Sequence, residues 1–223
     1  MHMKTLYIEK NSHDIKIFRQ ENSSFQLLQE FSSARQEEYD DFLKSLSPEQ
    51  IFVSRENSGF GFWNNIHKSH NPLAWVEKTK TRNSCTYQFD VRLEKLLSAL
   101  ALPKINERNF QEGITLIVEN NYNFFAVLAY KNKIYAAFEH DITKLTPQSL
   151  QKNLEEFRFG WLPHEEVIKQ SGAGCTIKNI PAEAEGFRPT FIACEHEECF
   201  NRFGRMISIE NTKETMVQLL RAI

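Results

Sequence analysis

One order of strands and helices occurs twice along this chain of 223 residues. Residues Thr5–Ser54 have the pattern of three short strands, a helix and a fourth strand, and residues Ile114–Cys194 repeat that pattern. Strands and helices in this order are typical of α/β folds. We therefore predict two related βββαβ halves, each a mixed sheet flanked by helices.

In the first half we expect strands at Thr5–Glu9, Asp14–Phe18 and Phe25–Leu28, separated by polar turns. Ser32 and Ser33 are the residue type that caps a helix, and apolar residues at helical spacing follow them. A short buried strand at Ile51–Ser54 completes the first copy.

The second copy has strands at Ile114–Val118, Phe124–Tyr130 and Ile134–Phe138. Thr146 then caps a helix that has proline at its first position, and Thr190–Cys194 is the matching fourth strand.

An amphipathic segment, Asp90–Leu102, lies between the copies and ends at a proline. We predict a first half at residues 1–89, a bridging helix and linker at 90–112, and a second half at 113–223. Thr212–Ala222 is expected to form a closing helix.

The composition excludes several classes of protein. A formal charge of -2 and a pI near 6.4 give no basic surface for nucleic acid. We find no apolar run near the ~20 residues that cross a bilayer and no signal-peptide core, so we expect a cytoplasmic protein without a membrane partner. The four cysteines are too sparse for a disulfide framework and are expected to be reduced thiols.

Glu139, His140 and Asp141 follow an expected strand, where α/β proteins commonly place ligands. A carboxylate beside an imidazole can orient a general base, or the group can hold a divalent ion. The alternative is a histidine hydrogen-bonded to backbone, with both acids in solvent.

Further ligand-binding candidates are Asn121 and Asn123 in a turn, and Gly172 and Gly174 after a short helix. Backbone N–H groups at two glycines can meet an anion, although a helix-ending turn explains them equally. The residues Cys194, His196 and Cys199 have the ligand types for zinc, but their spacing is looser than in common pairs. A solvated acidic loop is the alternative.

A longer pattern supports a resemblance, and its residues are Ile134–His140, Leu145, Leu150, Leu154, Phe157–Gly160, Leu162 and Glu165–Val167. They resemble an uncharacterised prokaryotic family described as "putative pyruvate formate-lyase activating enzyme-like". Its sequences look actin/Hsp70-like (ASKHA), which implies a duplicated ATPase fold of the ribonuclease H-like kind and binding of ATP with magnesium.

The chain departs from that family where phosphate would bind. In the family each copy opens with a glycine-containing turn, whereas the turns Glu9–His13 and Glu119–Asn123 contain no glycine. A Cβ at every position blocks close approach of the backbone, which disfavours ATP. The family's doubled histidine is His140-Asp141 here, and its glycine-histidine-glycine loop is Gly172–Gly174 without the imidazole. The chain thus resembles a shortened, divergent member of that family.

The family description does not transfer to chemistry. A radical activating enzyme needs three clustered cysteines for an iron–sulfur centre. The segment Cys194–Cys199 supplies two thiols and one imidazole, with Cys175 as a candidate fourth ligand. We therefore do not expect radical-SAM activity.

Two functions remain open. The first is a binding or assembly protein that has lost efficient ATPase activity and acts as a homodimer or with an enzyme partner. The alternative is a nucleotide- or phosphate-dependent enzyme, a hydrolase or phosphotransferase, that uses a divalent metal near Glu139, His140 and Asp141.

Overall fold

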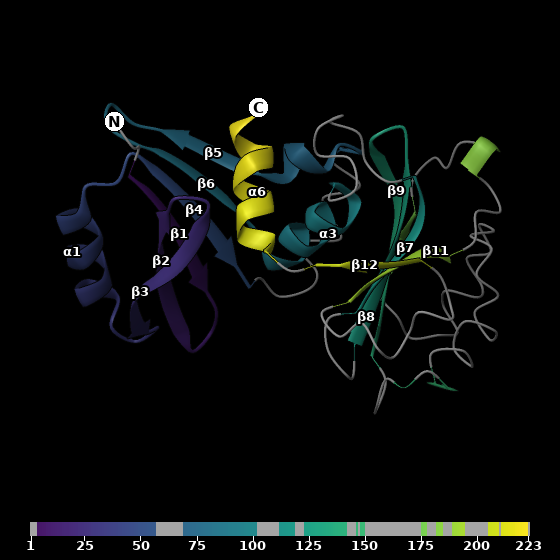
Figure 1. Ribbon diagram of the computed structural model, residues 1–223, viewed down its shortest axis with the longest axis horizontal. Coiled ribbons are helices and arrows are strands. Elements are labelled where there is room, and N and C mark those ends of the chain that lie inside the picture. Colours follow the sequence, from purple (N-terminus) through teal and green to yellow (C-terminus); the bar gives the residue numbers. More distant parts are fainter. Residues whose placement is uncertain are drawn as a thin grey trace. The chain divides into compact units, whose positions relative to one another are not determined.

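The computed structural model describes most of the first half and the strands of the second half (Figure 1). The described residues are 4–56, 69–101, 112–118, 123–141, 146, 148–149, 175–177, 182–184, 189–194, 205–209 and 211–222. Contacts divide the chain into two compact units. The first unit takes in Met1–Phe62, Leu73–Glu94 and Asn211–Ile223, and the second takes in Trp63–Pro72 and Lys95–Glu210. The boundaries that we expected at residues 89 and 113 stay a prediction.

The first unit contains a six-stranded sheet in the order β3-β2-β1-β4-β6-β5. Its strands are β1 (Thr5–Lys10), β2 (Asp14–Glu21), β3 (Ser24–Ser32), β4 (Gln50–Arg55), β5 (Glu77–Lys80) and β6 (Cys85–Asp90). β1, β2 and β3 are antiparallel neighbours, whereas β4 and β6 run parallel to β1. β5 closes the other edge antiparallel to β6.

The second unit contains a sheet in the order β10-β9-β8-β7-β11-β12. Its strands are β7 (Gly113–Val118), β8 (Asn123–Tyr130), β9 (Lys133–Asp141), β10 (Cys175–Ile177), β11 (Pro189–Cys194) and β12 (Arg205–Ser208). β7, β8 and β9 are antiparallel neighbours, whereas β11 and β12 run parallel to β7. The strands β3-β2-β1-β4-β6 of the first sheet therefore have the same order and the same directions as β9-β8-β7-β11-β12 of the second. This confirms the predicted α/β fold with two mixed sheets.

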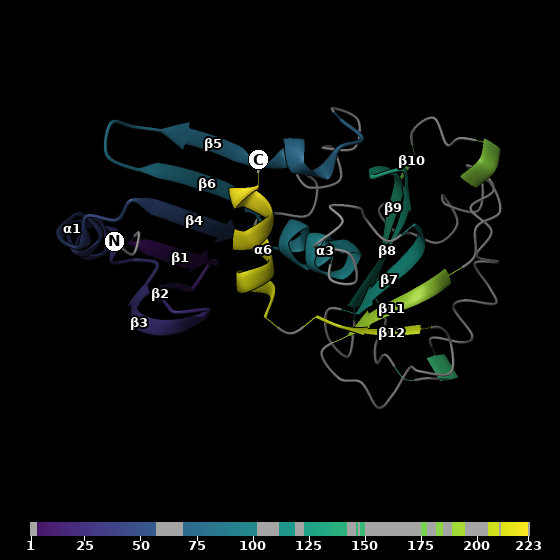
Figure 2. The same cartoon turned by 45° about the horizontal axis from the view of Figure 1, so that its top comes forward.

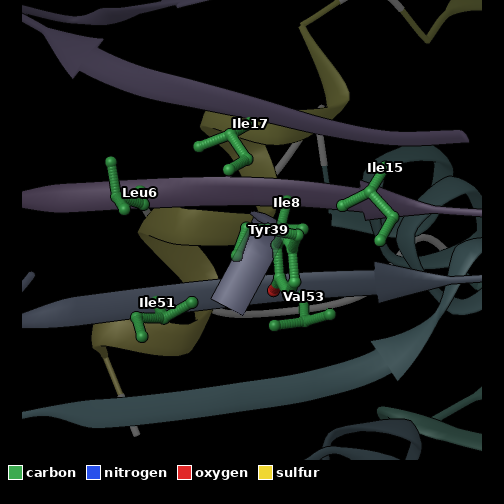
Figure 3. Packing of buried hydrophobic residues seen from close by; sticks show 7 residues of the cluster. All are labelled: Leu6, Ile8, Ile15, Ile17, Tyr39, Ile51 and Val53. Atoms are coloured by element: carbon green, nitrogen blue, oxygen red, sulfur yellow. The ribbon is translucent and has the colours of Figure 1, made fainter. Parts of the chain in front are cut away.

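Helix α1 (Gln36–Leu46) covers one face of the first sheet with an apolar cluster (Figure 3). The alternation in β2 directs Ile15 and Ile17 into this cluster, and Tyr39 reaches it from the helix. The buried members are Leu6, Ile8, Ile15, Ile17, Tyr39, Ile51 and Val53. Each buried aliphatic side chain contributes roughly 1.5–3 kcal/mol, so this cluster is a main source of the first unit's stability.

The start of α1 differs from the expectation. Ser32 is the last residue of β3, and the helix begins only after Arg35, whose side chain makes no capping hydrogen bond. The assignment of Ser32 and Ser33 as caps was therefore wrong. The pairing of β3 with β2 continues to Ser32, so this residue belongs to the strand and does not cap the helix.

Two shorter helical segments complete the described connections. η1 (Pro72–Trp75) precedes β5, and η3 (Ala182–Ala184) lies between β10 and β11. The expected cap at Thr146 is confirmed, because its Oγ1 accepts the Ser149 N–H at 3.1 Å and its own N–H donates to Ser149 Oγ at 2.7 Å. Most of the helix after it lies outside the described residues.

Helices α3 (Val91–Ala101) and α6 (Thr212–Arg221) each follow the fifth strand of the shared order, β6 and β12 respectively. α6 lies on the face of the first sheet opposite to α1 (Figure 1). Its residues Met216, Val217 and Leu220 are buried. The first sheet thus has helices on both faces, and one of them comes from the end of the chain.

None of the helices in the described part of the chain has the length and apolar content that a membrane-spanning segment requires.

Candidate functional site

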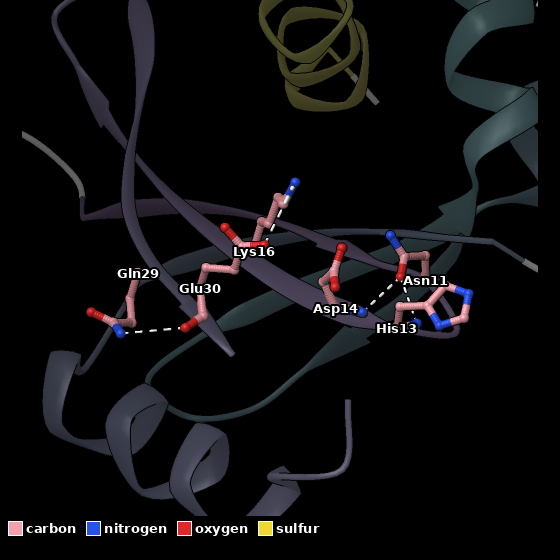
Figure 4. A network of polar contacts seen from close by, with 6 residues as sticks. All are labelled: Asn11, His13, Asp14, Lys16, Gln29 and Glu30. Atoms are coloured by element: carbon pink, nitrogen blue, oxygen red, sulfur yellow. Dashed lines mark hydrogen bonds and ion pairs between the residues drawn. The ribbon is translucent and has the colours of Figure 1, made fainter. Parts of the chain in front are cut away.

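The turn between β1 and β2 is closed by a side chain (Figure 4). The Asn11 Oδ1 atom accepts hydrogen bonds from the backbone N–H groups of His13 and Asp14, both at 2.7 Å. The Asn11 N–H donates to the Asp14 carbonyl oxygen at 3.1 Å. This is an Asx turn, which asparagine forms without the positive φ that favours glycine. The two N–H groups that face the turn are therefore occupied by the protein itself.

A lysine neutralises the acidic end of β1. The Lys213 ammonium of α6 lies 2.6 Å from the Glu9 carboxylate. The same ammonium lies 4.5 Å from the Phe18 ring centre and 5.8 Å from that of Tyr7. Cation–π attraction and the ion pair together hold this cation at the sheet surface.

A buried carboxylate lies at the carboxyl end of the parallel strands. Glu94 in α3 is 4% exposed. The Ser54 hydroxyl donates to its Oε2 at 2.7 Å, and the Thr212 hydroxyl donates to its Oε1 at 2.6 Å. Hydrogen bonds to both oxygens compensate part of the cost of burying a charge.

The Tyr7 hydroxyl is buried in this region and makes no hydrogen bond of good geometry. Burial raises the pKa of Tyr7 well above its usual value, and the negative charge of Glu94 raises it further. A second buried carboxylate, that of Asp90, accepts the Arg92 N–H at 2.8 Å.

This buried polar group was not among the residues that we expected from the sequence. Its signal was present, because Glu94 shares a helix stripe with Val91 and Leu97 in an otherwise apolar face. An acid on such a stripe indicates a buried, hydrogen-bonded charge.

Five of the predicted residues of the second half lie at the same end of the strands in its sheet. Strand register pairs Asn123 with Asp141, Phe124 with His140 and Phe125 with Glu139. The same row continues from Phe124 to Val118 in β7, to Cys194 in β11 and to Ser208 in β12. The backbone therefore brings five predicted residues to the carboxyl end of the parallel strands: Asn123, Glu139, His140, Asp141 and Cys194.

Other predicted residues lie outside the described part of the chain: Asn121, Gly172, Gly174, His196 and Cys199. Cys175, by contrast, is in β10, and three strands separate it from Cys194 in β11. At ~4.8 Å per strand the two backbones are about 19 Å apart, so Cys175 cannot join Cys194 at one metal. Cys175 is therefore ruled out as a fourth ligand beside Cys194, whereas the zinc candidates Cys194, His196 and Cys199 stay a prediction. Among the described residues, no three histidine, cysteine, aspartate or glutamate side chains are grouped to hold a metal ion.

Comparison with known families gives a match over residues 33–196, about three quarters of the chain. The family is described as "Putative pyruvate format-lyase activating enzyme (DUF1786)". The chain belongs to this family. A comparison with curated proteins gives no match.

Solved structures similar to this family member share little sequence with it. The ethanolamine utilization protein EutJ from Carboxydothermus hydrogenoformans is 12% identical, with a TM-score of 0.41 over 99% of this chain and 90% of that chain. The cytoplasmic domain of EpsL from Vibrio cholerae is 8% identical, with a TM-score of 0.38 over 99% and 95%.

A protein from Sinorhizobium meliloti described as a "putative 2-dehydro-3-deoxygalactonokinase protein" is also similar, at 8% identity and a TM-score of 0.34. The match covers 72% of this chain but only 58% of that protein. The chain therefore spans less than two thirds of that protein. Similarity at this level adds nothing to the strand order, which carries the fold assignment.

Proposed function

We propose that this chain is a binding or assembly protein whose first half does not hold nucleotide phosphate, and that it acts as a homodimer or with an enzyme partner. The Asx turn at Asn11 is the observation that carries the proposal. In the family that the sequence resembles, the corresponding turn contains glycine and presents its N–H groups to phosphate. Here the N–H groups of His13 and Asp14 already have an acceptor.

A phosphate at this turn would have to displace the Asn11 side chain. It would replace two hydrogen bonds of 2.7 Å with bonds of similar kind, so the net gain is small. The Glu9 carboxylate beside the turn adds repulsion, although Lys213 already screens it. Both terms oppose ATP at the first half.

The test is the thermal unfolding of the full chain with Mg·ATP, Mg·ADP and inorganic phosphate. We expect no change in Tm for the natural protein. A ligand at 100 times its Kd adds about 2.7 kcal/mol to the free energy of unfolding. For a chain of this size that is roughly 5–11 °C, and a shift of this size with any nucleotide contradicts the proposal.

Two variants connect the result to the turn. Asn11→Ala removes the acceptor and is expected to lower the free energy of unfolding by about 1–2 kcal/mol, measured by urea denaturation. Asn11→Asp keeps an acceptor oxygen at the same place and serves as the matched control, with less than half of that loss. An equal loss for both variants would show that the hydrogen bonds of the Asx turn are unimportant.

One observation favours the alternative, a nucleotide- or phosphate-dependent enzyme. The strand register brings Asn123, Glu139, His140 and Asp141 to the carboxyl end of the parallel strands in the second sheet. Ligands of α/β proteins commonly bind at this end. A nucleotide-induced rise in Tm that His140→Ala abolishes, while the unliganded Tm is unchanged, supports this function instead.

A further inference from the structure

The last helix of the chain is bound to the first sheet at both of its ends. Near its start, Thr212 donates to Glu94 at 2.6 Å, Lys213 pairs with Glu9 at 2.6 Å, and Glu214 accepts the Phe25 N–H at 3.1 Å. These partners come from three different elements of the first unit. The start of α6 is therefore specified by polar contacts and not by apolar packing alone.

At its other end, α6 is held by one side chain. Arg221 donates to Thr5 Oγ1 at 2.7 Å, to Gln20 Oε1 at 2.9 Å and to Gln50 Oε1 at 3.0 Å. Between the two ends, Met216, Val217 and Leu220 are buried. The helix thus has polar contacts at both ends and an apolar middle, and its polar partners lie 118 to 216 positions earlier in the chain.

A short connection leads into this helix from the other unit. β12 ends at Ser208 in the second sheet, and α6 begins at Thr212 on the first (Figure 2). Asn211, at the junction, has a φ of 58°, in the left-handed region. A residue other than glycine pays a conformational cost there, although asparagine pays less than most. The backbone at Asn211 is therefore strained, and a change of its φ to a negative value would release that strain.

We propose that two copies of this chain form a dimer by exchanging α6. In the dimer, α6 of each copy lies on the first sheet of the other, and Thr212, Lys213 and Arg221 meet the same partners as within one chain. Exchange of an identical element between two copies preserves every contact that the element makes and has a low energetic cost. The proposal concerns how a dimer forms and holds whether or not the chain binds nucleotide.

A covalent crosslink between two variant chains tests the exchange directly. The Arg221 guanidinium donates to Gln20 Oε1 at 2.9 Å, so a bis-maleimide long enough to replace the two long side chains should join the thiols of the double variant Gln20→Cys/Arg221→Cys within each monomer, which verifies the geometry. Chains carrying only Gln20→Cys and chains carrying only Arg221→Cys are then mixed at high concentration and treated with the same reagent. We expect a covalent heterodimer, with mass spectrometry locating the link between positions 20 and 221.

The control replaces Arg221→Cys with Gln218→Cys, an exposed position of the same helix. This mixture should give at least tenfold less heterodimer linked through position 20. If the double variant forms its internal crosslink and the mixed single variants form no link, the exchange does not occur.

The junction residue supplies an independent readout by size-exclusion chromatography with light scattering. Asn211→Gly relieves the strain in the monomer and should lower the dimer fraction, whereas Asn211→Ala increases the strain and should raise it. Because a dimer relaxes two junctions, we expect the dimerisation constants of the two variants to differ by tenfold or more. Equal constants, or the reverse order, contradict the proposal.

Discussion

At the scale of single residues, Tyr7 is the side chain whose titration the structure constrains most clearly. Its hydroxyl is buried, lacks a well-formed hydrogen bond, and has a pKa raised by burial and by Glu94. In the unfolded chain a tyrosine loses its proton near pH 10. The folded protein keeps this proton to higher pH, so Tyr7 removes stability as the pH rises above about 10 and contributes no such loss below it.

We therefore predict that Tyr7→Phe has two effects. At pH 7 the free energy of unfolding stays level or rises by about 1 kcal/mol, because an unsatisfied buried hydroxyl is removed. Between pH 10 and 11 the variant loses less stability than the natural protein. Urea denaturation at pH 7, 9, 10 and 11 measures both effects.

Tyr39→Phe is the comparison for this experiment, since burial also raises the pKa of Tyr39 but its ring is less deeply covered. Its effect on the alkaline loss should be smaller. A Tyr7→Phe variant that unfolds with the same pH profile as the natural protein contradicts the assignment.

Individual residues also show which features of the candidate site can be predicted from the sequence. The lack of glycine in the first turn, Glu9–His13, was visible in the sequence. The two hydrogen bonds to Asn11 Oδ1 were not visible, because a side-chain rotamer decides them. The bonds from Ser54 and Thr212 to Glu94 join residues 40 and 118 positions apart, which no local pattern encodes.

At the scale of elements, the apolar cluster under α1 gives the clearest prediction. Ile17 is fully buried there, between β1 and β3. Ile17→Ala should lower the free energy of unfolding by about 2–5 kcal/mol, since it removes transfer energy and leaves a cavity. Urea denaturation of the purified variant measures the loss.

Leu27→Ala is the matched control, because Leu27 is on the edge strand β3 and is 54% exposed. Its cost should stay within about 0.5 kcal/mol. Equal costs at both positions would mean that the cluster does not provide the main stability of the first unit.

Elements whose apolar residues recur at regular spacing or that have a strand-like composition were predictable from the sequence. Elements without such a pattern were not. Alternation located β2, β-branched and aromatic content located β1, and helical spacing located α1 and α3 within a few residues. β5, β6, β10 and β12 were missed. β5 has four exposed residues, Glu77–Lys80, so it shows no buried face in the sequence, and it forms an edge strand only because β6 pairs with it. Pairing partners decide such strands, and single-sequence patterns do not contain them.

At the scale of the whole molecule, α6 connects the end of the chain to its beginning. We predict that a chain ending at Glu210 has a weakened first unit, because Lys213 and Arg221 no longer cover β1 and the apolar residues of α6 are lost. Hydrogen exchange should rise at least tenfold in β1, β2 and β4. Amides of β7 and β8 in the second unit should change far less.

The comparison for this truncation is Gln218→Ala in the full-length chain, which alters only an exposed side chain of α6. It should leave exchange unchanged in both units. Equal loss of protection in both sheets of the truncated chain contradicts the grouping of α6 with the first unit.

The position of α6 also has a consequence for synthesis on the ribosome. Strand β6 ends at Asp90, and α6 begins at Thr212. Translation at ~5–20 residues per second separates them by roughly 6–24 s. During that interval the first sheet has emerged with one face still uncovered, including the rings of Tyr7 and Phe18 that Lys213 later covers. The first sheet is therefore synthesised before the second but is completed after it, and a chaperone or a neighbouring nascent chain has this time to reach the open face.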